Sequence, residues 1–355
     1  MTTDFQRMMS EAARLMRSGS LGEATAAIQQ ALGGAASPAA TSGVPQGRQR
    51  EDDVIDVEAR VVSEPASTPD AATRPTGESF AGGHFRNDCG ARDYKLFVPA
   101  GDTRRRPLVV MLHGCTQDPD DFARGTRMNA LARAQGFLVL YPSQSQRANA
   151  QRCWNWFKHN HQARGKGEPA ILAGMVREVI ASHDVDPDRV YVAGLSAGGA
   201  MAAILGDAYP DLFAAVGVHS GLPTGSATDV QTAFAAMSGG AQPLRRSQKQ
   251  GATPPTIVFH GDADTTVNIV NGERVMHAAG VFARPELRRG SSPMGVAWSC
   301  RRYVDAHGVD RAEEWTVHGA GHAWSGGDLA GSYTDPRGPD ASAEMLRFFL
   351  QHPRG

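Results

Sequence analysis

Ser196 lies in a G-x-S-x-G pattern within VYVAGLSAGGAM (190–201), where a strand-like apolar run gives way to glycine and then to alanine-rich sequence. A serine on such a strand-to-helix turn presents its hydroxyl at a helix N-terminus, where it can act as a nucleophile. The alternative interpretation is a glycine loop that cradles a phosphate. Because no Lys-Ser or Lys-Thr follows the glycines and the G-x-G-x-x-G order is absent, the pattern favours the nucleophile.

A serine nucleophile needs a general base, and the base needs a carboxylate that orients it. For a serine on such a turn, the expected chain order is serine, acid, histidine. In HGDADTTV (260–267), which follows a strand-like run, Asp264 is the preferred acid and Asp262 the fallback. In GAGHAW (319–324), after a later strand-like run, His322 is the candidate base. We therefore predict a Ser196–Asp264–His322 triad.

An oxyanion hole is expected from backbone N–H groups near the serine. The turn LHGCTQ (112–117) follows an apolar strand-like run. We predict that the N–H of Cys115 or Thr116, together with that of Ala197, forms this hole. His113 in the same turn is expected to bond to backbone and shape the loop rather than to take part in the reaction.

The segment CWNWF (153–157) carries two of the five tryptophans. Clustered aromatic residues usually pack in a core, and that interpretation is slightly favoured. Tryptophans that alternate around an asparagine also suit a platform for an extended, partly apolar ester chain. On that alternative, the candidate substrate-binding residues are Trp154, Asn155 and Trp156, joined by Trp324 because it lies two residues after His322.

The remaining histidines and the cysteines do not suggest a metal site. His219 follows a strand-like run and is expected to pack at the sheet end or to line the pocket. His159 and His161 form a pair without an evident third ligand, so we predict no metal. The four cysteines (Cys89, Cys115, Cys153 and Cys300) lie far apart and include no C-x-x-C pair. Their pairing is left open, with four buried thiols as the expectation in a reducing compartment.

Apolar runs alternate with helical patterns from about residue 78 to residue 355, and several runs are continuously apolar. This arrangement predicts an α/β domain with a mostly parallel sheet covered by helices on both faces. Strands are expected at 94–98, 108–112, 137–140, 190–193, 214–218, 256–260 and 315–318. Helices are expected at 120–135, 169–183, 197–209, 271–282 and 339–351.

The N-terminal part has a different composition. Apolar residues at helical spacing predict a helical hairpin over residues 1–32, which packs on its own domain or a second subunit; docking on a partner or a granule is the alternative. Residues 33–77 are rich in Ala, Ser, Thr, Pro and Gly, and predict a flexible linker. The segment VIDVEARVV (54–62) interrupts this linker and could add a strand to a sheet edge.

The charge balance disfavours some partners. The net charge is −1, from 36 basic and 37 acidic residues. Such a balance creates no field that would attract nucleic acid or an anionic membrane. No apolar run approaches the roughly 20 residues of a membrane span. The N-terminus lacks the apolar core of a signal peptide, so we expect a cytoplasmic protein.

Several phrases in one order (LVVMLHGCTQDPDDF, CWNWF, VYVAGLSAGGAM, HGDADTTVN, GAGHAWSGG) resemble the esterase family of polyhydroxybutyrate (PHB) depolymerases, whose relatives include acetyl xylan and feruloyl esterases. The resemblance covers about residues 94–350. It implies an α/β-hydrolase fold, a serine esterase mechanism and no cofactor. Ser196, Asp264 and His322 match the family triad, and Cys115 matches its oxyanion loop.

The resemblance implies a substrate class. The expected substrate is a polyhydroxyalkanoate polymer or oligomer, or a small acyl ester, inside the cell; an extracellular location, as for secreted relatives, is the alternative. A carbohydrate esterase acting on acetyl or feruloyl groups is a second hypothesis. An acyltransferase that uses the same acyl-enzyme is a third.

Overall fold

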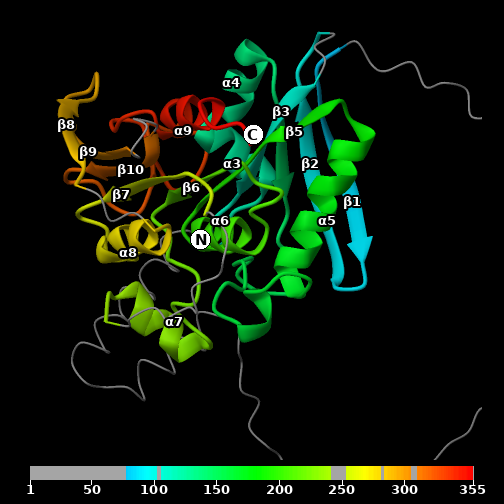
Figure 1. Ribbon diagram of the computed structural model, residues 1–355, viewed down its shortest axis with the longest axis horizontal. Coiled ribbons are helices and arrows are strands. Elements are labelled where there is room, and N and C mark those ends of the chain that lie inside the picture. Colours follow the sequence, from blue (N-terminus) through cyan, green and yellow to red (C-terminus); the bar gives the residue numbers. More distant parts are fainter. Residues whose placement is uncertain (1–76, 102–104, 241–252, 281–283, 305–309, 355) are drawn as a thin grey trace, which may run out of the picture.

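The computed structural model describes residues 77–101, 105–240, 253–280, 284–304 and 310–354. These residues form a ten-stranded sheet in the order β1-β2-β4-β3-β5-β6-β7-β10-β9-β8, with helices on both sides (Figure 1). The six central strands β4, β3, β5, β6, β7 and β10 are parallel, and the flanking strands pair antiparallel. This architecture is the predicted α/β-hydrolase fold. The predicted hairpin (1–32) and linker (33–77), apart from residue 77, lie outside the described residues.

The strands have the following bounds: β1 (Ser79–Asn87), β2 (Gly90–Val98), β3 (Arg106–Leu112), β4 (Leu138–Pro142), β5 (Val185–Leu195), β6 (Ala215–His219), β7 (Thr256–Gly261), β8 (Glu286–Ser291), β9 (Ala297–Val304) and β10 (Asp310–Val317), with β11 (Trp324–Ser325) and β12 (Thr334–Asp335) in a separate two-stranded sheet. The helices are α3 (Pro119–Thr126), α4 (Met128–Gln135), η1 (His159–His161), α5 (Gly167–Ser182), α6 (Ala197–Ala208), α7 (Val230–Met237), α8 (Val270–Ala278) and α9 (Ala341–Leu350).

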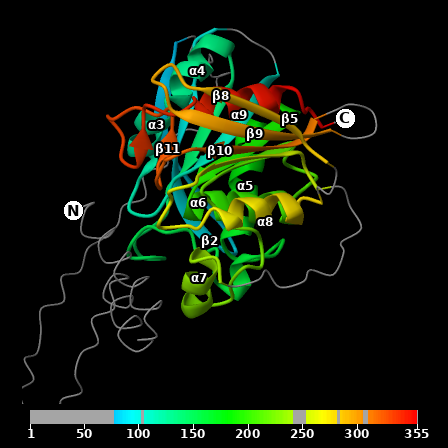
Figure 2. The same cartoon turned by 90° about the vertical axis from the view of Figure 1, so that its left-hand side faces the viewer.

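Each central strand contributes side chains to two hydrophobic clusters, one on either face of the sheet. In β3, Leu108 and Val110 belong to one cluster, and Val109 and Met111 belong to the other. Helices α5, α6 and α8 pack on the first face, and α3, α4 and α9 pack on the second (Figure 2). Because both faces are covered, β3, β4 and β5 contain continuous apolar runs (LVVML, LVLY and VYVAGL), which explains why such runs predicted these strands correctly.

The structure differs from the sequence prediction mainly at the edges of the sheet. Strand β8 (ELRRGS) is exposed along its whole length and has no apolar alternation, and β1 is interrupted by glycines. Neither strand was predicted, and nor was β9. The helix expected over 120–135 is divided into α3 and α4 because Arg127 adopts a left-handed conformation (φ 55°). Helix α7 was also not expected.

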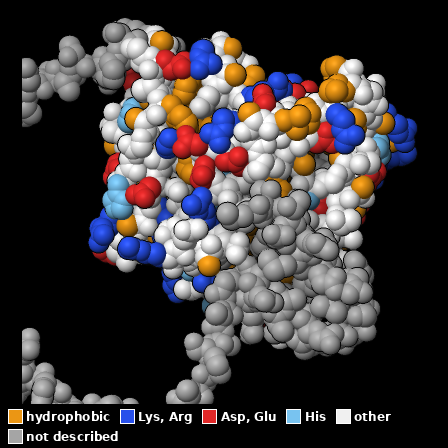
Figure 3. All heavy atoms as spheres, turned by 180° about the vertical axis from the view of Figure 1, so that it is seen from behind, with side chains coloured by type: hydrophobic (Ala, Val, Ile, Leu, Met, Phe, Trp, Pro, Cys, Tyr) orange, Lys and Arg blue, Asp and Glu red, His pale blue; other side chains and the backbone are white. Residues whose placement is uncertain are grey.

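Charges of both signs are interspersed over the face shown in Figure 3. Ion pairs among the described residues include Arg302–Asp310 and Arg133–Glu78, each with a shortest N–O distance of 2.6 Å. Helices long and apolar enough to span a bilayer are absent from the described ranges.

Candidate active site

Ser196 lies at the turn between β5 and α6, at the carboxyl end of the parallel sheet. Its backbone is in an unusual conformation for a residue with a side chain (φ 58°, ψ −118°). Its N–H donates to the carbonyl of His219 over 2.9 Å, which fixes the turn to β6. The turn also requires glycines, because a Cβ on Gly198 would lie 2.0 Å from the carbonyl oxygen of Leu112 and one on Gly194 would lie 2.3 Å from the carbonyl carbon of Gly198. The local geometry is that of a nucleophile elbow.

His322 and Asp264 are in direct contact. Nδ1 of His322 lies 2.7 Å from Oδ2 of Asp264. The other carboxylate oxygen, Oδ1, accepts hydrogen bonds from the N–H groups of Thr266 (2.9 Å) and Val267 (2.8 Å). Burial raises the pKa of Asp264, but His322, His260 and the hydrogen bonds outweigh burial and hold that pKa below its usual value. Asp264 is therefore a buried, charged acceptor that fixes the orientation of the His322 ring.

The fallback acid, Asp262, has a different partner. Its Oδ2 lies 2.8 Å from Nδ1 of His318, and its Oδ1 accepts from the N–H of Gly319 over 2.6 Å. Nε2 of His318 in turn lies 2.8 Å from Oγ of Ser299. These three side chains form a second serine–histidine–aspartate contact set, but it is partly exposed, and none of its members lines the cavity described next.

Ser196 and His322 line the same cavity, whose volume is about 840 Å³ including its open mouth. Its walls are mostly apolar and come from several segments that lie far apart in the sequence. The lining residues are Gly114, Cys115, Cys153, Trp156, Phe157, Leu195, Ser196, Ala197, Leu222, Val230, Ala233, Phe234, Met237, Thr266, Val267, His322 and Tyr333. Helix α7, which was not predicted, supplies four of these residues. A mostly apolar cavity with a few convergent polar groups is typical of a ligand site.

Two predicted oxyanion residues, Cys115 and Ala197, also line the cavity. Ala197 is the first residue of α6, so its N–H has no acceptor within the helix. The third candidate, Thr116, is engaged elsewhere, because its N–H donates to the carbonyl of Gln151 over 2.6 Å. The structure thus narrows the two alternatives on this loop to Cys115.

His113 has the structural role that was expected. Its Nδ1 contacts the carbonyl oxygen of Gly114 (2.7 Å), and its Nε2 accepts from the N–H of Gln144 (3.1 Å). Burial lowers the pKa of His113 to about 4, so the ring is neutral at physiological pH. It joins the loop after β3 to the loop after β4.

Only one of the four candidate substrate-binding residues lines the cavity. Trp156 lines the cavity, but Trp154, Asn155 and Trp324 are buried away from it, so that prediction is wrong for these three. The indole N–H of Trp154 donates to the carbonyl of His113 over 3.1 Å. The indole N–H of Trp324 donates to Oγ of Ser342 over 3.0 Å. Because the indole N–H groups form hydrogen bonds inside the protein, both rings are core residues. For Trp154 this agrees with the favoured interpretation that the aromatic residues of CWNWF pack in a core.

Other histidines also pack in the interior. Nε2 of His219 accepts from the N–H of Ser325 over 3.0 Å, and its ring stacks on Phe259 and Trp324. Nδ1 of His161 accepts from the N–H of Glu168 over 3.2 Å. His219 therefore packs at the sheet end as expected and does not line the cavity. In the described part of the chain, no group of three or more His, Cys, Asp or Glu side chains is arranged to hold a metal ion.

The cysteines are not four buried thiols, and that expectation is wrong. Cys115 and Cys153 form a disulfide, Cys89 is an exposed thiol and Cys300 is a buried thiol. The sequence could not reveal this pair, because 38 positions separate the two cysteines. They meet because the loops after β3 and β4, which are neighbours in the sheet, both turn toward the cavity.

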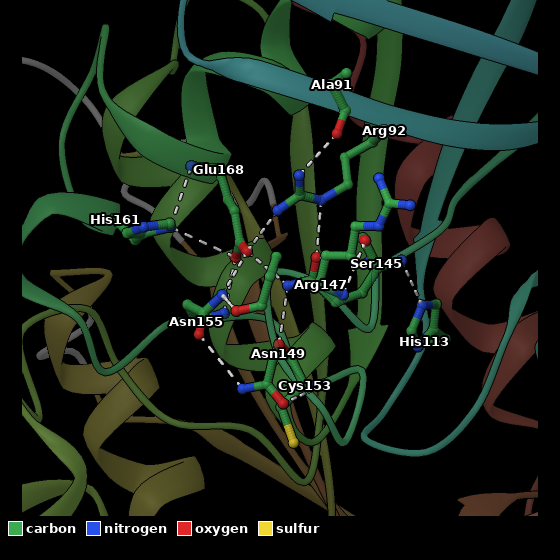
Figure 4. A network of polar contacts seen from close by, with 12 residues as sticks. Ala91, Arg92, His113, Ser145, Arg147, Asn149, Cys153, Asn155, His161 and Glu168 are labelled. Atoms are coloured by element: carbon green, nitrogen blue, oxygen red, sulfur yellow. Dashed lines mark hydrogen bonds and ion pairs between the residues drawn. The ribbon is translucent and has the colours of Figure 1, made fainter. Parts of the chain in front are cut away.

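Glu168, a residue that the sequence did not single out, organises the loop that carries Cys153. Its buried carboxylate accepts hydrogen bonds from Gln144 (2.5 Å), from the side chain and the N–H of Asn155 (both 2.7 Å) and from Arg92 (3.0 Å; Figure 4). Burial raises its pKa, but the nearby His161 and the hydrogen bonds from Gln144 and Asn155 outweigh burial and lower the pKa to about 2. A single glutamate near the start of a helix has no sequence signature that would distinguish it.

Comparison with known proteins agrees with this geometry. The family described as Esterase PHB depolymerase matches residues 92–282, more than half of the chain. Poly(3-hydroxyalkanoate) depolymerase C of Paucimonas lemoignei is 35% identical over 63% of this chain and 56% of that protein. Poly(3-hydroxybutyrate) depolymerase of Ralstonia pickettii is 29% identical over 64% of this chain and 50% of that protein. The chain thus spans about half the length of these two relatives.

Two further relatives act on other esters, as their names indicate. Feruloyl esterase B of Thermothelomyces thermophilus is 29% identical over 59% of this chain and 77% of that protein. The acetyl xylan esterase of Aspergillus awamori has a similar structure, with a TM-score of 0.58 and 19% identity over 73% of this chain and 94% of that one; this likeness supports the fold. The family match, the fold and the serine elbow agree, and the chain belongs to the esterase family of PHB depolymerases.

Proposed function

We propose that this protein is a carboxylic ester hydrolase that works through an acyl-enzyme on Ser196. The observation that carries the proposal is the shared cavity: a serine on a strained elbow and a histidine oriented by a buried aspartate line the same apolar space. Nδ1 of His322 is bonded to Asp264, so Nε2 is the nitrogen left to act as the base.

The reaction follows from these positions. Nε2 of His322 takes the proton of the Ser196 hydroxyl while Oγ attacks the ester carbonyl. The oxyanion accepts hydrogen bonds from the N–H groups of Ala197 and Cys115. The tetrahedral intermediate collapses, and His322 gives the proton to the leaving alcohol. Water then attacks the acyl-enzyme with His322 again as the base, which releases the acid and restores the serine.

The cavity walls favour a polyhydroxyalkanoate chain, as polymer or oligomer. The described lining residues include no Lys, Arg, Asp or Glu, and most of them are aliphatic or aromatic. Such walls suit the methylene and methyl groups of a neutral polyester, whereas a polysaccharide presents many hydroxyl groups that require polar partners. A carbohydrate esterase is the second candidate, because this chain matches 77% of the length of a feruloyl esterase.

The decisive experiment compares two serine variants. Ser196→Ala should lower kcat for p-nitrophenyl butyrate by about 10⁴-fold or more, because residual activity comes only from binding and the oxyanion hole. Ser299→Ala is the matched control, since Ser299 belongs to the second serine–histidine–aspartate contact set outside the cavity. Near-normal activity of Ser196→Ala would falsify the proposal. Rates on 3-hydroxybutyrate oligomers and acetylated xylan then decide between the two substrate classes.

A further inference from the structure

The Cys115–Cys153 disulfide lies in the wall of the cavity, next to the reacting groups. Both cysteines line the cavity together with Ser196 and Ala197. One end of the bond is Cys115, whose N–H is proposed above to receive the oxyanion. The disulfide is therefore attached to the residue that has to be placed precisely, and it is the only covalent tie between the two loops within the described residues.

The Cys153 end of the disulfide is held firmly. Gln144 donates from its side-chain nitrogen to the carbonyl of Cys153 (2.9 Å) and to Glu168 (2.5 Å). The next two residues are fixed as well, since Trp154 is fully buried and Asn155 bonds twice to Glu168 (Figure 4). Because a charged carboxylate with several donors forms strong hydrogen bonds, this loop provides a rigid anchor.

The Cys115 end belongs to a turn that lacks regular structure. Hydrogen bonds hold this turn on either side of Cys115: the indole N–H of Trp154 donates to the carbonyl of His113 (3.1 Å), and the N–H of Thr116 donates to the carbonyl of Gln151 (2.6 Å). Thr116 is in the left-handed conformation (φ 66°), which is unfavourable for a β-branched residue. Within the described residues, the Cys115 N–H donates no hydrogen bond and the Cys115 carbonyl accepts only from the adjacent Thr116 Oγ1 (2.6 Å). The disulfide is therefore the contact that ties Cys115 to another segment of the chain.

We propose that the Cys115–Cys153 disulfide is a positioning element of the oxyanion hole, and that its reduction slows hydrolysis without unfolding the protein. This inference rests on the proposed serine esterase function. Removal of one oxyanion donor costs about 10²- to 10³-fold in kcat. A displaced donor keeps part of its effect, so we expect a loss of about 10- to 100-fold. The hydrogen bonds at His113 and Thr116 remain after reduction, and they keep the turn folded.

The experiment uses a water-soluble phosphine on the Cys89→Ser variant, which lacks the exposed thiol. The phosphine takes oxygen from water and becomes a phosphine oxide, while the disulfide gains two electrons and two protons and becomes two thiols. Thiol titration after denaturation should rise from one group, Cys300, to three. kcat for p-nitrophenyl butyrate should fall about 10- to 100-fold with little change in KM, and reoxidation should restore it.

A second measurement separates positioning from general support of the fold. A trifluoromethyl ketone forms a hemiketal oxyanion on the serine, so its affinity should fall by about the same factor as kcat, while the far-UV circular dichroism stays unchanged. A Cys115→Ala/Cys153→Ala variant should start at the lower kcat and show no response to the phosphine. This reversible treatment of the intact chain remains informative even if that variant does not fold.

Two outcomes overturn the inference. One is an unchanged kcat when titration shows that the disulfide is open; the other is a loss of kcat with unchanged affinity for the ketone. These outcomes differ from the one that would contradict the proposed serine esterase function. That outcome is activity retained by Ser196→Ala in the oxidised protein, before any reductant is added.

Discussion

Oδ2 of Asp264 lies 2.7 Å from Nδ1 of His322. This contact joins the loop after β7 to the loop after β10. The neighbouring Asp262 also joins these loops, but through His318. Two aspartates on one loop thus face two histidines on the other, and only the pair with Asp264 includes a residue that lines the cavity.

The two aspartates should therefore behave differently when they are changed to asparagine. Asp264→Asn leaves a neutral amide against His322, which disfavours the required tautomer and the imidazolium that forms during the reaction. We expect kcat for p-nitrophenyl butyrate to fall by about 10³- to 10⁴-fold. Asp262→Asn, the matched control, should keep kcat within about threefold of the native value. Equal losses in the two variants would contradict the assignment of the acid.

The glycines of the elbow give a second prediction. A Cβ on Gly198 would lie 2.0 Å from the carbonyl oxygen of Leu112 and 2.6 Å from that of His113. Because both atoms are backbone, Gly198→Ala should shift the turn, lower the free energy of unfolding by about 3 kcal/mol or more, and reduce kcat. Gly82→Ala in β1 is the control, since its Cβ would have a nearest contact of 3.9 Å. The free energy of unfolding in denaturant and kcat are measured for both variants. Equal stability of Gly198→Ala and Gly82→Ala would contradict the close approach of Leu112 and His113 to Gly198.

The two tryptophans of CWNWF give a third prediction. Trp156 lines the cavity, whereas Trp154 packs behind it. Trp156→Ala should lower kcat/KM for p-nitrophenyl butyrate about 10-fold more than for the acetate, because the longer acyl chain loses apolar contact. Trp154→Ala should leave the ratio of the two rates unchanged and lower the free energy of unfolding by about 3–5 kcal/mol. The assignment fails if Trp154→Ala is the variant that changes the ratio.

The sequence predicts those parts of the fold and the site whose residues form a recognisable local pattern. Strands β3, β4 and β5 are buried on both faces of the sheet, and their continuous apolar runs identify them in the sequence. Ser196, Asp264 and His322 come after β5, β7 and β10, and the fold brings the ends of these parallel strands to one edge of the sheet. The exposed strand β8 has no apolar pattern, and it was missed for that reason.

The parts of the site that the sequence did not predict depend on long-range contacts. Whether a tryptophan lines a cavity or fills a core is decided by the loops that cover it, and nothing in the CWNWF segment itself distinguishes Trp154 from Trp156. The Cys115–Cys153 pair requires two loops to meet, and the compartment argument that predicted thiols contains no information about this contact. Glu168 is important because its carboxylate contacts four residues, none of which adjoins it in sequence.

His113 gives a prediction about pH and stability. Its pKa is about 4 in the folded protein and about 6.5 ordinarily, because the buried ring is held neutral. The unfolded chain binds a proton below pH 6.5 that the folded protein does not bind until about pH 4. The stability that His113 contributes is therefore complete above pH 6.5 and is lost as the pH falls toward 4, by at most about 1.4 kcal/mol per pH unit.

His113→Gln removes this titration, and a comparison of the two proteins isolates it. His219, whose pKa burial also lowers, to about 3, is present in both and cancels in the difference. The native protein should be more stable than the variant at pH 7.5, and this advantage should shrink by about 2 kcal/mol at pH 5. Unfolding in guanidinium at both pH values measures the difference in stability between the native protein and the variant. A difference that stays constant between pH 7.5 and pH 5 would mean that His113 titrates normally in the folded protein, and that the ring is not held neutral between Gly114 and Gln144.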